Sequence, residues 1–413
     1  MKICVFTLGC KVNASESDSI VRDLIGRGYE VTEELEPADL YIINTCAVTA
    51  EAEKKSRQTA ARAAKLNPNA KIVFTGCACQ KNAVPFAEKK NAQLVTGVFG
   101  KGKIPDMLEE RGILLSPEDK EFEELLPPLS DRARSYIKVQ DGCNNFCSYC
   151  IIPYLRGRTR SRSPESVLRE VCALSSAEIV LNGINLSAYD YRGKKLKDLV
   201  LALKDVNKRV RLGSLEVNVV DEEFLSALTL LKDFAPQFHL SLQSGSDAVL
   251  KKMNRHYTAE EYLEKVRLIR SFFPFAGITT DIIAGFPSET EENFEETLRL
   301  VDRAEFSDIH CFCYSPRSGT LAYKMPDLPA EVKRERLERL MKKKELCRAR
   351  FEEKNLGRTE KVVVEEQADG YFAGYTGNYL RAYLKEALPN EEVSVIIKER
   401  FKDGVLCEKF QEE

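Results

Sequence analysis

Tryptophan is absent from this 413-residue chain, and histidine occurs only three times, at His239, His256 and His310. With so few imidazoles, a histidine-rich zinc or iron site is not expected. Long apolar runs are also missing, because none approaches the roughly 20 residues that a bilayer-spanning helix needs. The first residues, MKICVFTLGCKVN, lack a small-residue cleavage site and predict an opening β-strand rather than a secretion signal. We therefore expect no membrane association and a cytoplasmic location.

An excess of charge of either sign is lacking too, since the net charge is only −2. The overall charge therefore indicates no acidic partner. Hydrophobic residues make up 43% of the chain and charged residues 31%, which excludes a disordered polypeptide. The length fits about two to three domains.

Cysteine, in contrast, is abundant, with thirteen in the chain. Disulfides are disfavoured in a reducing compartment. Closely spaced cysteines in such a chain therefore indicate metal binding or catalysis.

The first hundred residues alternate between strand and helix patterns. Apolar strand candidates at 2–8, 38–45, 70–76 and 92–98 are separated by longer segments with helical spacing. This alternation predicts a parallel sheet in an N-terminal α/β domain. We place that domain at residues 1–112 and an acidic, proline-containing linker at 113–128.

The alternation restarts in the central part of the chain, which we place at residues 129–355. Six further strand candidates predict a partial (β/α)6 barrel resembling part of a TIM barrel; they are 135–140, 177–182, 209–214, 238–243, 277–285 and 308–315. A site is then expected at the carboxyl ends of these strands. Short β-rich runs in residues 356–413 predict a small antiparallel β-barrel.

Cys143, Cys147 and Cys150 form a C-x3-C-x2-C loop directly after the first predicted barrel strand. A structural zinc ion normally takes four ligands, and no fourth cysteine or histidine is near in sequence. Three thiolates suit a [4Fe–4S] cluster that keeps one iron open for a further ligand. Zinc binding and incidental buried cysteines are the alternatives.

A second set of cysteines is spread along the N-terminal domain. Cys10, Cys46 and Cys77 each follow a predicted strand directly. Because parallel strands end at one edge of the sheet, these thiols are expected to meet there and to hold a second cluster. Cys79 competes with Cys77 for the third position, and ordinary buried cysteines remain the alternative to a cluster.

The motif combination resembles the radical S-adenosylmethionine (SAM) methylthiotransferase family over essentially the whole length. The loop CNNFCSYC resembles the radical SAM signature, and the segments LGCKVN, NTCAVT and TGCACQ resemble the three additional cysteine motifs of that family. Further matches are LQSGSDAVLKKMNRHYT, TTDIIAGFPSET and YSPRSGTLAY. The C-terminal segment resembles a TRAM domain, a small RNA-binding β-barrel.

The resemblance implies two [4Fe–4S] clusters and SAM as cofactors, on Cys143, Cys147 and Cys150 and on Cys10, Cys46 and Cys77. One SAM would supply a 5′-deoxyadenosyl radical and a second SAM the methyl group, because an unactivated C–H bond of adenine calls for cofactor chemistry. Candidate SAM-binding residues are Tyr149, Gly183, Asn185, Glu216, Gln243 and Gly285. A low-potential electron donor of the flavodoxin or ferredoxin kind is an implied partner, while the sulfur donor is not indicated.

Within the family, the motifs look most like the branch that methylthiolates C2 of N6-threonylcarbamoyladenosine next to the anticodon of tRNA. Isopentenyladenosine in tRNA and an aspartate of a ribosomal protein are alternative targets. A non-catalytic RNA-binding metalloprotein is the alternative from a different class.

RNA contact is predicted for four closely spaced arginines, Arg156, Arg158, Arg160 and Arg162, because guanidinium groups bind phosphates. Binding of the SAM carboxylate and pairing with acidic residues are the alternatives. Aromatic residues of the C-terminal segment, Tyr371, Phe372, Tyr375, Tyr379 and Tyr383, either stack on bases or fill the core of the small barrel.

Overall fold

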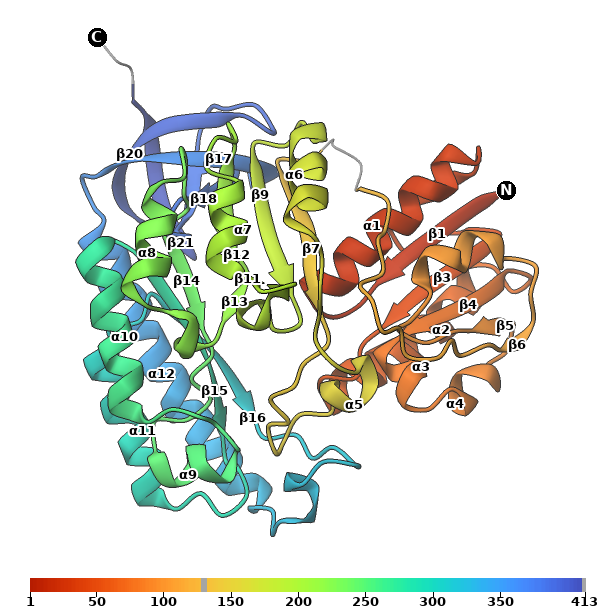
Figure 1. Cartoon of the computed structure of the whole chain (residues 1–413), viewed down its shortest axis with the longest axis horizontal. Coiled ribbons are helices and arrows are strands. Elements are labelled where there is room, and N and C mark those ends of the chain that lie inside the picture. The colour runs from red at the N-terminus through yellow and green to blue at the C-terminus, as the bar shows by residue number, and fades with distance from the viewer. Residues whose placement is uncertain (128–131, 411–413) are drawn as a thin grey trace.

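The computed structural model describes residues 1–127 and 132–410. The predicted boundary between linker and central domain, at 128/129, lies outside the described residues. Figure 1 shows an N-terminal sheet beside the central strands and a small barrel covering one end of these strands. None of the helices in 1–127 and 132–410 combines the length and apolar character that crossing a membrane requires.

The N-terminal sheet is parallel throughout, as predicted, with strand order β2-β1-β3-β4-β5-β6. Its strands are β1 (Lys2–Thr7), β2 (Glu30–Thr32), β3 (Leu40–Thr45), β4 (Lys71–Gly76), β5 (Ala92–Val95) and β6 (Gly112–Ile113). The helices are α1 (Lys11–Gly26), α2 (Ala50–Leu66), α3 (Cys77–Lys81), α4 (Val84–Ala87) and the 3-10 turn η1 (Lys101–Asp106). The edge strands β2 and β6 have only three and two residues, too few for a readable pattern.

The central part forms the predicted six-stranded open barrel. Its strands are β7 (Arg134–Asp141), β9 (Glu178–Gly183), β12 (Arg209–Leu212), β14 (Gln237–Leu240), β15 (Gly277–Ala284) and β16 (Asp308–Cys313). Backbone hydrogen bonds of Val210 with Asp233 and Ala235 join the sheet ending in β12 to the one containing β14. Helix α1 of the N-terminal domain packs against β7 and β9, so it closes part of the open side.

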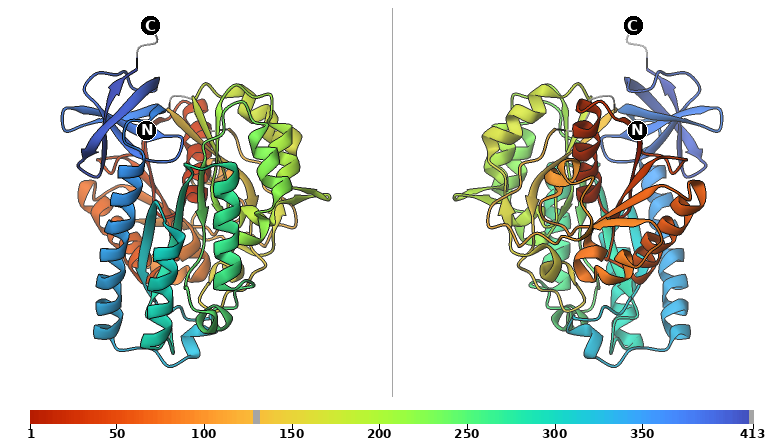
Figure 2. Two further views of the ribbon diagram at one scale, coloured as in Figure 1. Left: turned by 90° about the vertical axis from the view of Figure 1, so that its left-hand side faces the viewer. Right: turned by 90° about the vertical axis from the view of Figure 1, so that its right-hand side faces the viewer.

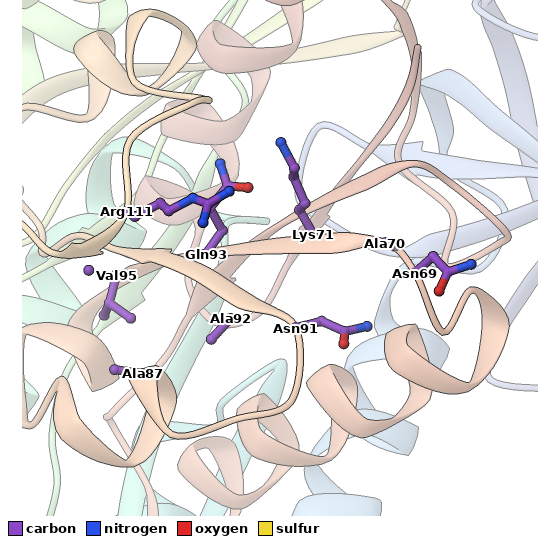
Figure 3. A pocket seen from close by; sticks show the side chains of 10 residues that line it. Asn69, Ala70, Lys71, Ala87, Asn91, Ala92, Gln93, Val95 and Arg111 are labelled. Atoms are coloured by element: carbon purple, nitrogen blue, oxygen red, sulfur yellow. The ribbon is translucent and has the colours of Figure 1, made fainter.

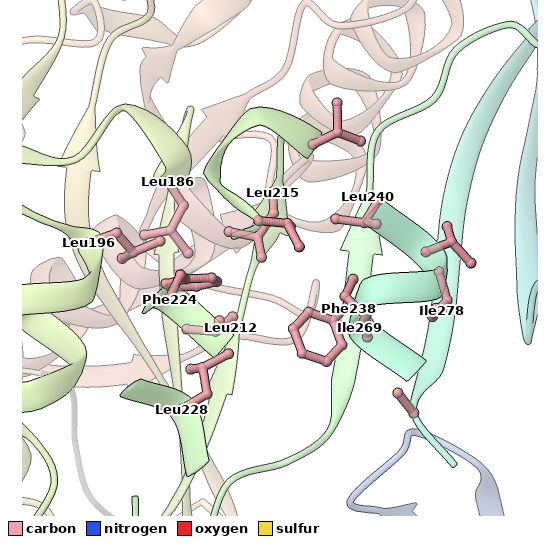
Figure 4. Packing of buried hydrophobic residues seen from close by; sticks show 14 of the residues in the cluster. Leu186, Leu196, Leu212, Leu215, Phe224, Leu228, Phe238, Leu240, Ile269 and Ile278 are labelled. Atoms are coloured by element: carbon pink, nitrogen blue, oxygen red, sulfur yellow. The ribbon is translucent and has the colours of Figure 1, made fainter. Parts of the chain in front are cut away.

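Helices cover the outside of this barrel (Figure 2), and the largest apolar core lies between them and the strands (Figure 4). The helices of the central part are α5 (Ile152–Arg156), α6 (Pro164–Ala173), α7 (Leu196–Ala202), α8 (Glu222–Thr229), α9 (Asp247–Lys252), α10 (Ala259–Phe272), α11 (Glu291–Ala304) and α12 (Ala330–Lys354). Of these, α5 packs on α3 of the N-terminal domain instead of the outside of the barrel. Shorter elements are β8 (Arg160–Ser161), β10 (Asp190–Tyr191), β11 (Lys194–Lys195), β13 (Ser214–Leu215), η2 (Leu186–Ala188), η3 (Val217–Val219) and η4 (Ala322–Lys324). Phe224 and Phe238 are fully buried in the core, which fixes the strands that carry the site.

The C-terminal segment closes into a five-stranded barrel of order β17-β18-β19-β21-β20. The strands are β17 (Thr359–Ala368), β18 (Tyr371–Thr376), β19 (Arg381–Leu384), β20 (Glu392–Phe401) and β21 (Gly404–Lys409). The barrel is antiparallel, as predicted, at every seam except that between β19 and β21, which pair in parallel. The sequences of β19 and β21, with four and six residues, do not indicate the direction of the strands. The direction of β21 follows from the hairpin that it forms with β20.

A buried carboxylate fixes this barrel to the central domain. Glu178 accepts two hydrogen bonds from Arg211, at 2.7 and 2.9 Å, and lies 2.5 Å from the guanidinium of Arg134. Arg211 also donates to the backbone oxygens of Thr376 and Gly377 in the C-terminal barrel. The loop after β18 is therefore held at the amino end of the central strands.

Candidate functional site

One cavity of about 870 Å³ lies where the three parts of the chain meet. All six predicted ligand cysteines line it: Cys10, Cys46, Cys77, Cys143, Cys147 and Cys150. The cavity continues along β14, β15 and β16, from Gln243 beyond the carboxyl end of β14 to Gln237 at its start, and reaches the C-terminal barrel. The two cysteine trios, the N-terminal one and the C-x3-C-x2-C one, therefore share a single chamber.

The N-terminal trio arises from three neighbouring parallel strands. Cys10 caps helix α1 after β1, Cys46 follows β3, and Cys77 opens α3 after β4. Gly9 permits their close approach, because a Cβ built there would lie 2.9 Å from Sγ of Cys46. Gly9 also has a φ of +106°, which side-chain-bearing residues rarely adopt.

Cys79 lies apart from this chamber. Its side chain is completely buried and does not line the cavity, and its backbone N–H donates to Oγ1 of Thr45 at 3.4 Å. Burial raises the pKa of the Cys79 thiol to about 12. The structure thus brings Cys77, and not Cys79, together with Cys10 and Cys46.

The C-x3-C-x2-C trio lies on the loop after β7, with polar donors around its sulfurs. Cys143 Sγ accepts from the backbone of Asn145 at 3.5 Å and from Nδ2 of Asn185 at 3.7 Å. Cys147 Sγ accepts from Nη1 of Arg255 at 3.4 Å, and the same nitrogen donates to Glu216 at 3.0 Å. Sequence reasoning missed Arg255 and Asn145, although both lie inside the quoted motifs.

Arg156 is fully buried and reaches the N-terminal trio from helix α5, which follows the C-x3-C-x2-C loop. Its Nε donates to Sγ of Cys77 at 3.4 Å, while Nη1 pairs with Glu16 at 2.9 Å and Asp141 at 3.1 Å. Burial opposes the ionisation of Glu16, but Arg156, Lys101 and Lys138 hold its pKa well below the ordinary value. Nothing in sequence pointed to Glu16, which lies 140 residues before Arg156.

The prediction of phosphate contact is wrong for three of the four arginines. These three pair with acidic residues, which was the alternative. Arg156, Arg160 and Arg162 are buried. Arg160 faces Asp141, and Arg162 pairs with Glu170 and Glu124, the last from the predicted linker. Burying an arginine requires such a partner. Arg158 is exposed, with its guanidinium 4.7 Å from the ring centroid of Phe146, and its contact with RNA stays a prediction.

Five of the six candidate SAM-binding residues line the cavity: Tyr149, Gly183, Asn185, Glu216 and Gln243. Gly285 does not. Its N–H donates to Glu289 at 2.9 Å and its Cα faces Lys333 of α12, so the chain turns away from the chamber there. The structure therefore does not bring Gly285 to the chamber with the other five candidates.

The aromatic residues of the C-terminal barrel divide into two groups. Tyr383 is buried and bonded to Asp403, and Phe372 packs on the barrel core. Tyr375 and Tyr379 instead line the cavity, with ring centroids 4.5 Å apart and planes 16° from parallel. Arg211, which pairs with Glu178, lies 4.8 Å from the centroid of the Tyr379 ring. The buried ion pair therefore also helps to position Tyr375 and Tyr379.

The donor sets fit [4Fe–4S] clusters. Each trio offers three thiols to one chamber and has a guanidinium donor on a cysteine sulfur, Arg156 on one side and Arg255 on the other. N–H donors to sulfur stabilise the anionic thiolate and the cluster it holds. Burial raises the pKa of Cys46 to about 11 and of Cys150 to about 12, so binding of iron must release these protons.

A second hollow, of about 350 Å³, lies at the amino ends of β4, β5 and β6 (Figure 3). Lys71, Gln93 and Arg111 line it, and no cysteine does. It therefore lies at the sheet edge opposite to the thiols.

Two family models match the chain. Residues 137–301 match the model described as the Radical SAM superfamily, and residues 2–99 match the one described as Uncharacterized protein family UPF0004. The first covers β7 to α11 and the C-x3-C-x2-C loop, and the second covers the sheet with Cys10, Cys46 and Cys77.

Similar proteins agree in their reaction class. The chain is 38% identical over 385 residues to "Threonylcarbamoyladenosine tRNA methylthiotransferase MtaB" of Aquifex aeolicus, which covers 89% of this chain and 93% of that protein. The Bacillus subtilis protein of the same name is 36% identical, covering 93% and 90%. A "tRNA-2-methylthio-N(6)-dimethylallyladenosine synthase" of Thermoanaerobacter sp. is 39% identical, covering 81% and 76%.

Among solved structures, the radical SAM methyltransferase TsrM of Kitasatospora setae shares the fold, with a TM-score of 0.56 at 16% identity over 78% of this chain and 77% of that one. The predicted fold class, α/β with a radical SAM barrel and a terminal β-barrel, is thereby confirmed. Because relatives above 30% identity span most of its length, the chain belongs to the radical SAM tRNA methylthiotransferases, a family that uses SAM and [4Fe–4S] clusters.

Proposed function

We propose that the enzyme methylthiolates C2 of N6-threonylcarbamoyladenosine next to the anticodon of tRNA. The observation that carries this proposal is the single chamber lined by both cysteine trios and by Tyr375 and Tyr379. Two of the relatives compared above carry the threonylcarbamoyladenosine name. The location would be the cytoplasm, where tRNA and a flavodoxin- or ferredoxin-like electron donor are available.

The chamber's own side chains cannot remove hydrogen from an unactivated C–H bond, so bound cofactors must supply that step. When bound, SAM and the two clusters would supply the radical, the sulfur and the methyl group, with two SAM molecules used per product. Cys143, Cys147 and Cys150 would hold the cluster that faces SAM. Cys10, Cys46 and Cys77 would hold the second cluster.

The surrounding residues would orient these groups. Glu216, fixed by Arg255, offers a carboxylate to the SAM amino group, and Asn185 and Tyr149 lie on the same wall. Gly183 and Gln243 also line the chamber, and Gly183 permits close packing on Gln140, because a Cβ there would lie 2.8 Å from that side chain. The paired rings of Tyr375 and Tyr379 can stack on a base that enters from the RNA side.

The dimethylallyladenosine relatives support a second candidate, the same reaction on isopentenyladenosine, since the Thermoanaerobacter protein is 39% identical. To separate the two, reconstituted enzyme with SAM and reductant is given tRNA carrying one or the other nucleoside. Mass spectrometry of the digested tRNA should show a methylthio product only with threonylcarbamoyladenosine. Product only with the isopentenyl form would replace the proposal by its rival. Product with neither, but on a ribosomal protein, would move the target out of RNA.

A matched pair of variants tests the assignment of the radical cluster. Cys147→Ala should abolish product, whereas Cys172→Ala should leave it unchanged because Cys172 is an exposed free cysteine outside the chamber. Retained turnover in Cys147→Ala would refute the role of the C-x3-C-x2-C trio.

A further inference from the structure

Two of the chain's three histidines meet on the cavity wall formed by β14, β15 and β16. His239 lies on β14, Asp281 on β15 and His310 on β16, and Asp281 is directly paired with His310 in the strand register. Nε2 of His239 is 3.3 Å from Oδ2 of Asp281, and Nδ1 of His310 is 3.2 Å from Oδ1. All three ligand atoms lie within 4.8 Å of one another.

Each imidazole nitrogen faces a different oxygen of Asp281, and one donor atom from each of the three residues lies within 4.8 Å of the other two, so the three side chains can surround one ion. Nitrogen and oxygen ligands lie about 2.0–2.1 Å from a tetrahedral zinc ion, so they stand about 3.4 Å from each other. Two imidazoles and one carboxylate form a donor set that first-row divalent metals accept, and it leaves coordination positions open.

The His239 ring is already oriented for this task. Oγ1 of Thr279 lies 3.0 Å from its Nδ1, and Nε2 of Gln237 donates to the same hydroxyl at 3.0 Å. This fixes the ring with Nε2 toward Asp281, the type of outer contact that orients metal-binding histidines.

The charge of Asp281 also points to a cation. Its side chain is 27% exposed, and in the described part of the chain the ion pairs give it only the two imidazoles, with no lysine or arginine. No lysine or arginine in these ion pairs therefore competes with a metal cation for this carboxylate.

We propose that His239, Asp281 and His310 bind one divalent transition-metal cation, of the Zn²⁺ or Fe²⁺ class, separate from both cysteine trios. His310 is 51% exposed and lines the cavity together with His239 and Asp281, so the open coordination positions face the chamber. Water or an oxygen of a bound substrate would fill these positions. The site goes beyond the proposed reaction and does not depend on which nucleoside is the substrate.

The test measures zinc in the cluster-loaded enzyme after equilibration with Zn²⁺ and removal of the excess. We expect one zinc per chain in the parent enzyme and at least a tenfold loss in His239→Gln and His310→Gln, with iron unchanged. His256→Gln is the matched control, since His256 is the third histidine and is exposed. Asp281→Asn keeps the shape of the carboxylate, so its tenfold loss would show that charge and not folding is responsible.

X-ray absorption at the zinc edge distinguishes this site from zinc bound by thiols. Only nitrogen and oxygen at about 2.0–2.1 Å are expected, whereas a sulfur shell at about 2.3 Å would place zinc on cysteines and overturn the proposal. Zinc below a tenth of an equivalent in the parent enzyme, or equal loss in His256→Gln, would overturn it too. Because no turnover is measured, failure of methylthiolation leaves this result unaffected.

Discussion

Nε of Arg156 donates a hydrogen bond to Sγ of Cys77 across 3.4 Å, although these residues come from different domains and are 79 positions apart. The same guanidinium pairs with Glu16 and Asp141. One arginine on the C-x3-C-x2-C side thus holds a sulfur of the other trio in place.

Replacing Arg156 by Gln should therefore separate the cleavage of SAM from the formation of the methylthio product. We expect iron binding at the N-terminal trio to weaken about 10- to 100-fold, because a donor to its ligand is lost. Glu16 and Asp141 lose their shared guanidinium but keep Lys138, so the free energy of unfolding should fall by less than the about 3–5 kcal/mol that a buried charge without any partner costs. Iron analysis, SAM cleavage and methylthio product are measured together, and cleavage should persist without product. Arg158→Gln, at an exposed position, is the control; equal iron loss in both would contradict the role of Arg156.

Arg255 should be needed for the cleavage of SAM. Lysine in its place keeps the charge but lacks the planar fork that joins Glu216 to Cys147. We expect the rate of 5′-deoxyadenosine formation to fall about 10- to 100-fold in Arg255→Lys. Lys252→Gln, exposed on the same segment, should keep the parent rate. An unchanged rate in Arg255→Lys would show that the fork is dispensable.

Serine substitutions distinguish the two neighbouring cysteines of α3. Cys77→Ser should lower the iron content from about eight to about four per chain, as expected when one of two four-iron clusters is lost. Cys79→Ser should keep both clusters, because Cys79 lies outside the cavity. Electron paramagnetic resonance of the reduced protein gives the same count independently. The reverse pattern would make Cys79 the ligand.

Tyr375 should contribute to binding of tRNA. Leucine keeps apolar volume but removes the stacking face, which is worth about 1–3 kcal/mol per base, so the KM for tRNA should rise about 5- to 150-fold. SAM cleavage in the absence of tRNA should not change. The control is Tyr371→Leu, because Tyr371 packs on Phe401 and not on the cavity. An equal rise of the KM for tRNA in both variants would mean that the substitutions destabilise the barrel and do not remove a stacking contact.

Acid should reduce the contribution of Glu178 to stability. Burial raises its pKa, but Arg211, Arg134 and Arg209 outweigh this and hold it below the ordinary value. The stabilisation is therefore complete above the unfolded pKa near 4.5 and is lost as the pH falls through the lower folded value. Glu178→Gln should lower the melting temperature clearly at pH 7, and the difference from the parent should shrink below about pH 4.5. A difference that is constant with pH would exclude this ionic origin.

The convergence of Cys10, Cys46 and Cys77 could be predicted because parallel strands share one edge and each cysteine directly follows a strand. The burial of Arg156, Arg160 and Arg162 could not be predicted, because most of their acidic partners are distant in sequence. In the sequence, Arg156 looks like part of a basic surface, and its partner Glu16 lies 140 residues away. The meeting of His239 with His310 depended in the same way on the order of β14, β15 and β16.

Gly285 lies apart from the chamber lining because Lys333 of the distant helix α12 packs over it, which no local pattern indicates. Which tyrosines line the cavity depends on how the C-terminal barrel packs on the central domain. Glu178 and Arg211 help to fix that packing.

The chamber takes its walls from the first, middle and last parts of the chain. During synthesis the ribosome releases all six cysteines long before β18 and β19 emerge. The side lined by Tyr375 and Tyr379, where we propose that RNA enters, is thus the last to be built. A protein truncated before residue 356 would leave the chamber open on that side and expose its thiols to oxygen and solvent.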